Sequence, residues 1–180
     1  FSDNSIITQN TFSSTCSLWL SCSVLEDNGL VMTWASITSN IITNIGTGIV
    51  DGGQYGINLT PWTFGVNISS NTISNAQVGI PLEGASGTTI SSNTILNPRA
   101  EAILVEESTA DTTVNNTISN NTILTYNPSY PMVKLYDRVD ANGTLATLSN
   151  NAYINVYKGR LPIIESLTTG WDSYSLDKDQ

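Results

Sequence analysis

Histidine is absent from this 180-residue chain, and charged residues make up only 12% of it. The absence of histidine excludes histidine-based catalytic triads, histidine general bases and the commonest zinc and copper sites. Six Lys and Arg against 15 Asp and Glu give a net charge of −9, so no basic patch exists to replace the counterions of a nucleic acid. No apolar run approaches the roughly 18 to 20 residues of a membrane span. Nucleic acids are therefore not expected as partners, and no membrane span is expected.

Cysteine is also scarce, and Cys16 and Cys22 are the two copies. An extended strand would separate them by about 20 Å, whereas a disulfide needs Cα atoms within roughly 7 Å. A Cys16–Cys22 disulfide therefore requires residues 17–21 to turn back, which we expect in an oxidising compartment; two small buried thiols are the alternative. Two cysteines alone make a poor metal site, so we predict no metal centre there. No cofactor is expected, and Ca²⁺ is the one that stays open.

Uncharged polar residues are abundant, with 20 Asn, 22 Ser and 23 Thr. Chains of this composition are common outside the cell, so we expect a secreted or cell-surface location. The chain starts at Phe1 without a Met or a charged leader, which suggests a mature chain or a fragment. Chance alone gives about five Asn-x-Ser/Thr sequons in this composition, so the sequons permit N-glycosylation without arguing for it. They lie at Asn58, Asn67, Asn115, Asn120 and Asn142.

One six-residue pattern recurs along the chain: apolar, x, x, Asn, x, apolar. Its copies span residues 37–42, 68–73, 90–95, 118–123 and 148–153. Near the start, residues 1–6 and 7–12 both fit the pattern, so the register there is open. A second apolar segment follows each of the first four Asn residues by about 8 to 11 positions, at 48–50, 79–82, 102–105 and 132–135. These short segments, rich in Thr, Ile and Val, predict strands, and no segment shows sustained helical periodicity.

Each repeat therefore predicts a strand, an Asn corner, a second strand, a loop and a third strand. Unequal intervals between copies favour a coil with fixed strands and variable loops, which is an all-β, right-handed parallel β-helix (a solenoid) of about five to six rungs. Asn suits the corner because it tolerates left-handed backbone angles and because stacked amides form a ladder. The expected ladder is Asn40, Asn71, Asn93, Asn121 and Asn151. A β-sandwich with scattered Asn-rich turns is the alternative.

The runs 67–75 and 89–97 resemble right-handed parallel β-helix repeats of the pectate-lyase-like superfamily. The resemblance covers roughly residues 1–157 and implies a fold shared by polysaccharide lyases, mannuronan epimerases, glycoside hydrolases and surface proteins. Residues 158–180 are expected to form a non-repeat C-terminal cap. Their segment 170–179 resembles one that often follows the last complete rungs, and Trp171, Tyr174 and Leu176 would cover the open end.

The resemblance also places an active groove, where one exists, along one exposed sheet. If Ile49, Ile80, Ile103 and Val133 point inward, the outward positions are Val50, Pro81, Leu104 and Lys134, followed by Gly52, Glu83, Glu106 and Tyr136. Glu83 and Glu106 would then be neighbours, suited to a retaining glycosidase or to Ca²⁺. Lys134, Tyr136 and Arg138 have the chemistry of a uronate lyase. The alternative is a solvated strand face, since no lyase or epimerase signature is recognisable.

Aromatic residues supply another candidate site. Trp62 lies in an expected exposed loop with Tyr55 nearby, and both are candidate sugar-stacking residues; packing of the loop against the coil is the alternative. Trp19 and Trp34 lie among apolar residues and are expected in the core or an interface.

Three functions remain open. The first is an extracellular structural module of a surface fibre or assembly, with a second copy or a neighbouring chain at its N-terminal end. The second is a fragment of a polysaccharide lyase or glycosidase, and the third is a carbohydrate-binding module. A net charge of −9 argues against a polyanionic substrate unless Ca²⁺ intervenes.

Overall fold

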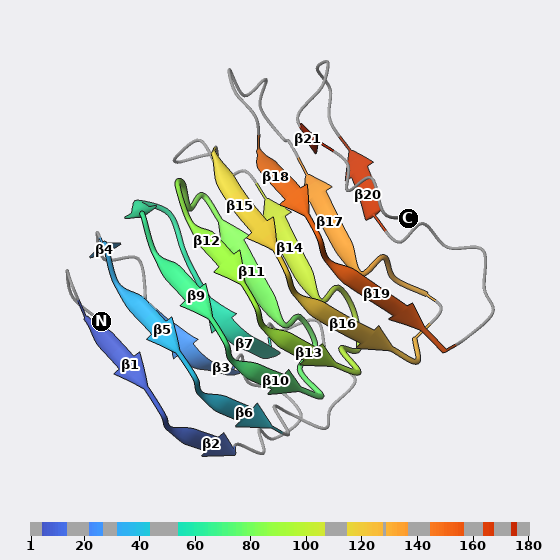
Figure 1. The fold of residues 1–180 in the computed structure, drawn as a ribbon, viewed down its shortest axis with the longest axis horizontal. Coiled ribbons are helices and arrows are strands. Elements are labelled where there is room, and N and C mark those ends of the chain that lie inside the picture. The colour runs from blue at the N-terminus through green and yellow to red at the C-terminus, as the bar shows by residue number, and fades with distance from the viewer. Residues whose placement is uncertain are drawn as a thin grey trace.

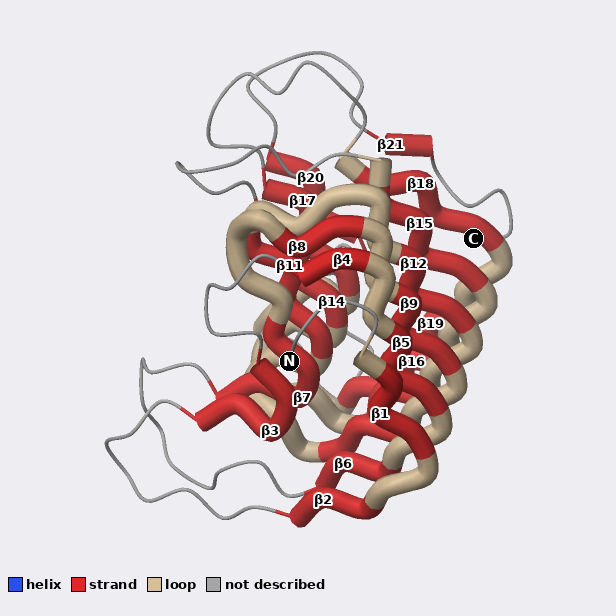
Figure 2. Tube along the Cα trace, turned by 90° about the vertical axis from the view of Figure 1, so that its left-hand side faces the viewer, coloured by secondary structure: helices blue, strands red, loops and turns tan. Residues whose placement is uncertain are grey.

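Parallel strands wind into a coil in this computed structural model (Figure 1). The structure describes residues 5–13, 22–26, 32–43, 54–106, 115–127, 129–136, 145–156, 164–167 and 174–175. None of these residues forms a helix, so this part of the chain contains no apolar helix able to cross a membrane. Figure 2 shows the strands of successive turns stacked one above another.

Three sheets form the sides of the coil. The seven-stranded sheet has, in spatial order, β1 (Ile6–Thr8), β5 (Ser36–Thr38), β9 (Asn67–Ser69), β12 (Thr89–Ser91), β15 (Asn116–Ser119), β18 (Ala146–Ser149) and β21 (Tyr174–Ser175). The six-stranded sheet has β19 (Ala152–Asn155), β16 (Thr122–Thr125), β13 (Thr94–Leu96), β10 (Thr72–Ser74), β6 (Ile41–Thr43) and β2 (Thr11–Ser13). The four-stranded sheet has β11 (Ile80–Glu83), β14 (Ile103–Glu106), β17 (Val133–Tyr136) and β20 (Ile164–Leu167).

Two shorter parallel pairs complete the described strands. β3 (Cys22–Glu26) pairs with β7 (Gln54–Asn58), and β4 (Met32–Thr33) pairs with β8 (Thr63–Phe64). β7 continues the four-stranded side, because single bridges join it and Leu59 to the turn that holds β11.

The predicted repeat and the all-β parallel solenoid are confirmed, and the sandwich alternative is excluded. Each copy of the pattern supplies one strand of the seven-stranded sheet, a corner and one strand of the six-stranded sheet, as in β9 followed by β10. The expected count of five to six rungs is not supported: the coil amounts to about three turns. The count failed because the number of repeated corners was taken as the number of complete turns, whereas the sheets differ in length.

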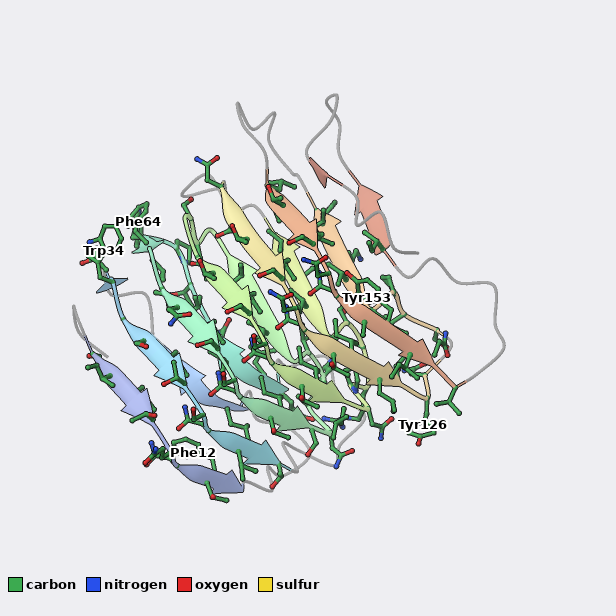
Figure 3. The ribbon with its side chains drawn as sticks, viewed as in Figure 1. Phe12, Trp34, Phe64, Tyr126 and Tyr153 are labelled. Atoms are coloured by element: carbon green, nitrogen blue, oxygen red, sulfur yellow. The ribbon has the colours of Figure 1, made fainter. Side chains whose placement is uncertain are left out.

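Isoleucine columns fill the interior. The side chains before and after each Asn corner point inward as predicted, and those of β9, β10, β12 and β13 are at most 1% exposed. Burial of one such side chain stabilises the fold by about 1.5 to 3 kcal/mol. One column is Phe12, Ile42, Ile73, Ile95, Ile123 and Tyr153. Its two aromatic end members, marked in Figure 3, are partly buried against the core.

The asparagine ladder is present and buried. Each Oδ1 accepts hydrogen bonds from the backbone N–H and the Nδ2 of the preceding rung; for Asn93 the donors are Asn71 N at 2.9 Å and Asn71 Nδ2 at 3.0 Å. Each Nδ2 also donates to an isoleucine carbonyl, in Asn93 to that of Ile68 at 2.9 Å. The ladder includes all five predicted residues, Asn40, Asn71, Asn93, Asn121 and Asn151.

Asn10 is a further member of the ladder. Its backbone N donates to Asn40 Oδ1 at 3.0 Å, which selects 7–12 as the first copy of the pattern. Asn4, in the competing register, lies outside the described residues.

Left-handed backbone angles occur at the corners, but one residue earlier than predicted. Positive φ belongs to the residue before each ladder Asn, for example Ser70 at 58° and Ser92 at 56°. The ladder Asn itself is not in this conformation, so its presence at the corner reflects its hydrogen bonds rather than its backbone tolerance.

Part of the expected C-terminal cap takes part in the sheets. β20 pairs with β17, and β21 pairs with β18, so the coil's pairing pattern extends past residue 157. Trp171 and Leu176 lie outside the described residues, and the capping role of 158–180 stays a prediction.

Replacing a central ladder residue should destabilise the fold strongly. Asn93→Ala leaves two donors of Asn71 and the Ile68 carbonyl without their partner in a buried site, so we expect a loss of about 3 to 4 kcal/mol in the free energy of unfolding. Urea unfolding followed by circular dichroism measures it. Asn67→Ala, which truncates an exposed asparagine of β9, is the matched control and should change stability by less than about 0.5 kcal/mol. Equal effects of the two changes would contradict the structural importance of the ladder.

Candidate functional site

The four-stranded side brings most of the predicted groove residues into register. Ile80, Ile103 and Val133 pair in one inward column and are fully buried, as expected. The first expected member was wrong: the bridge between Leu59 and Leu82 puts Ile57, not Ile49, beside Ile80. Ile49, Val50 and Gly52 lie outside the described residues. The error arose because more residues separate β6 from β7 than separate the corresponding strands of later turns.

An acidic row runs along the ends of these strands. Glu83 pairs with Glu106, and Glu106 with Tyr136, so the three predicted residues are neighbours on successive rungs spaced by about 4.8 Å. Glu83 is exposed, whereas Glu106 and Tyr136 are half-buried. Two carboxylates at this spacing suit a retaining glycosidase or part of a cation site.

The other outward positions are less open than expected. Pro81 is buried, and Leu104 and Lys134 are half-buried. Lys134 Nζ lies 3.7 Å from Glu101 Oε1 and 5.8 Å from the ring centre of Tyr136. Because Glu101 neutralises this amine, Lys134 is less available to a substrate carboxylate than the sequence suggested. Arg138 lies outside the described residues.

A polar cluster at the opposite ends of the strands escaped the sequence analysis. Glu101 is only 8% exposed, and Gln54, at the start of β7, is only 1% exposed. Arg99 Nη2 donates to Gln54 Oε1, and burial lowers the pKa of the Arg99 guanidinium. Arg99 and Glu101 come directly before β14, and this position in the sequence could have indicated that they lie at the end of that strand. Within the described ranges, no three Asp, Glu or Cys side chains gather as metal ligands.

A second candidate site is an aromatic corner at which Trp34 lies beside Phe64, with Trp62 two positions before Phe64 in the preceding turn. The side chains of Trp34, Trp62 and Phe64 are 72%, 45% and 38% exposed. Trp34 is therefore not in the core, and its expected place at an interface stays a prediction. β4 pairs with β8, and Trp34 N donates to Phe64 O at 3.0 Å, which brings Trp34 beside Phe64 (Figure 3). Trp62 lies in the turn before β8 and is exposed, as predicted.

Tyr55 does not join this corner. It lies at the start of β7, bridges Val78 and is half-buried, whereas Trp62 follows the other end of the strand. Tyr55 and Trp62 therefore lie on different elements, and their use as a shared sugar contact stays a prediction.

The predicted modification sites differ in exposure. Asn67, Asn115 and Asn120 are exposed, whereas Asn58 is 4% exposed at the end of β7. Asn142 and Cys16 lie outside the described residues, and the side chain of Cys22 is not described, so the disulfide stays a prediction. Asn116, beside one sequon, has a structural role that the sequence analysis missed: its Oδ1 accepts from Thr88 N at 2.9 Å.

Comparison with protein families agrees with this geometry. The family described as a right handed beta helix region matches residues 55–161. Because the match spans more than half of the chain, this chain belongs to the right-handed β-helix family. No curated protein and no solved structure matches the chain significantly. The family fixes the hand of the coil and leaves its specific function open.

Sequon exposure predicts which sites a folded chain can glycosylate. Passage through a eukaryotic secretory pathway should leave glycans on Asn67, Asn115 or Asn120 and none on Asn58, because a glycan on a buried side chain cannot fit the folded coil. Mass spectrometry of peptides after glycan release measures occupancy. A well-folded product with high occupancy at Asn58 would contradict the register of β7.

Proposed function

We propose that this chain is a structural β-helix module of the cell exterior, a stiff building block of a surface fibre or assembly. The observation that carries the proposal is the ladder of six asparagines, five of them buried, in which the side-chain amides join successive rungs. Bending between rungs would break hydrogen bonds in a site that water does not reach, so the coil resists bending.

The ladder also gives the coil a polarity that suits end-to-end assembly. Each Asn accepts from the rung before it and donates to the rung after it. Copies of such a coil extend one another head to tail, and head-to-tail contacts that do not close into a ring build filaments. A second copy or a neighbouring chain at the N-terminal end is the partner that this polarity favours.

The outer faces support a location in water outside the cell. The seven-stranded sheet carries an outward column of hydroxyls without charge: Thr8, Thr38, Ser69, Ser91, Ser119 and Ser149. The three exposed sequons lie in or beside this sheet. Such a surface is hydrated without depending on ionic strength, because it has few charges to be screened.

Assembly should depend on protein concentration. Light scattering after size exclusion is expected to give a mass that rises with concentration, and negative-stain electron microscopy to show elongated particles. Thr11→Lys places a charge on β2, the last described strand of its sheet, and should weaken assembly; Thr147→Lys, on an exposed site of β18, is the matched control. A constant monomer mass and uniform compact particles would sink the proposal.

A catalytic module acting on polysaccharides is the second candidate, and the acidic row favours it. Glu83 and Glu106 are in register on neighbouring strands, with Glu83 exposed, Glu106 half-buried and Tyr136 on the following rung. Ca²⁺ bound there would need further oxygen ligands from the substrate or water, since it takes six to eight.

Activity assays separate this candidate from the structural one. A uronate lyase releases an unsaturated product visible by ultraviolet absorbance, and a glycosidase releases reducing ends. Either activity, if carried by the acidic row, should fall at least about 100-fold in Glu83→Gln or Glu106→Gln. Absence of product over a panel of neutral and uronate polymers, with and without Ca²⁺, would contradict the catalytic candidate.

A further inference from the structure

The aromatic corner holds two tryptophans in a backbone conformation that bulky residues rarely adopt. Trp34 has a φ of 58° and Trp62 a φ of 69°. The other described non-glycine residues with positive φ are Ser, Asn and Gln, which tolerate it better. Strained, exposed aromatic residues contribute little to folding, so their placement points to a function outside the core.

The equivalent positions on the following turns are glycines. Trp34 N donates to Phe64 O, and Gly65 N donates to Ser86 O in the same pattern one turn later. Gly65 and Gly87 have φ of 67° and 63°, so this corner of the fold is suited to glycine, and Trp34 replaces it on one turn.

The ring of Trp34 lies on the backbone of the next turn. A Cβ added to Gly65 would lie 2.9 Å from Cε3 of Trp34, so only glycine leaves room for the ring. Gly87, on the turn after that, is exposed, and a Cβ there would meet nothing closer than 3.7 Å. The indole therefore lies over Gly65 with the exposed Gly87 on the following turn, and Phe64, whose backbone bonds to that of Trp34, is also exposed.

Charge around the corner restricts the ligand. Residues 54–70 and 84–91 contain no charged side chain, and Glu83, whose N donates to Leu59 O at 2.8 Å, brings one exposed carboxylate beside the turn of Trp62. A carboxylate accepts hydrogen bonds from sugar hydroxyls and repels a polyanion. No Lys or Arg in these segments attracts an anionic lipid surface.

We propose that Trp34, Trp62 and Phe64 form a binding platform for a neutral polysaccharide. The ring faces stack on the apolar faces of pyranose units, the open space at Gly87 lets the polysaccharide approach, and the Glu83 carboxylate accepts hydrogen bonds from sugar hydroxyls. The platform is independent of the assembly proposed above.

Replacing Trp34 with glycine, the residue at the equivalent position of the following turns, tests binding separately from folding. Trp34→Gly removes the ring and relieves the backbone, so the melting temperature should stay the same or rise while binding falls at least about tenfold. Phe64→Ala should weaken binding similarly. Tyr126→Ala, which truncates a 53% exposed ring at the opposite corner in Figure 3, is the matched control and should bind as the unchanged chain does.

The assay is co-sedimentation with insoluble cellulose, chitin and mannan, with immobilised polygalacturonate and phosphatidylcholine vesicles beside them. Retention by at least one neutral polymer, lost in Trp34→Gly and Phe64→Ala and kept in Tyr126→Ala, supports the platform. The proposal is overturned by a lack of retention on every neutral polymer, by unchanged binding in Trp34→Gly, or by equal binding to polygalacturonate or vesicles.

Discussion

A buried amide needs all its hydrogen bonds, and this requirement determines how the turns stack. In the ladder, each Oδ1 accepts from both the backbone and the side chain of the rung before, and each Nδ2 donates to the next Asn and to an isoleucine carbonyl. Sliding one rung by a residue would leave several of these groups without partners, at about 1 to 3 kcal/mol each. The ladder therefore fixes the register, and the buried isoleucine columns supply the hydrophobic stabilisation of the coil in that register.

Fixed register also fixes what the surface presents. Because side chains alternate, inward Ile80 and Ile103 place Glu83 and Glu106 together on the outside. The same register brings Trp34 beside Phe64, although 30 positions separate them in the sequence. The acidic row and the aromatic corner are thus both consequences of stacking, and Glu83 belongs to the row and borders the corner. A scaffold of this kind holds exposed groups without needing them for its own stability.

Polar partners refine this arrangement. Lys134 faces Glu101 from the preceding turn, and Arg99 reaches Gln54, so cations near the acidic sheet are already engaged within the chain. These two contacts, among the described residues, hold neighbouring turns together. Trp34 differs from these polar residues, because its side chain is exposed although its backbone has a positive φ.

The amino-acid pattern alone was enough for the solenoid, five ladder residues and the inward isoleucines, since a short motif repeated in frame carries its own register. That pattern did not predict which residues pair when a loop of variable length separates their strands. Ile57 rather than Ile49 lies beside Ile80, Glu101 meets Lys134, and Trp34 is exposed. Each of these depends on how much chain a loop takes up between two strands, and loop length leaves no periodic signal in the residues. Local periodicity therefore determined the rungs, and only the stacked structure decided which side chains meet across them.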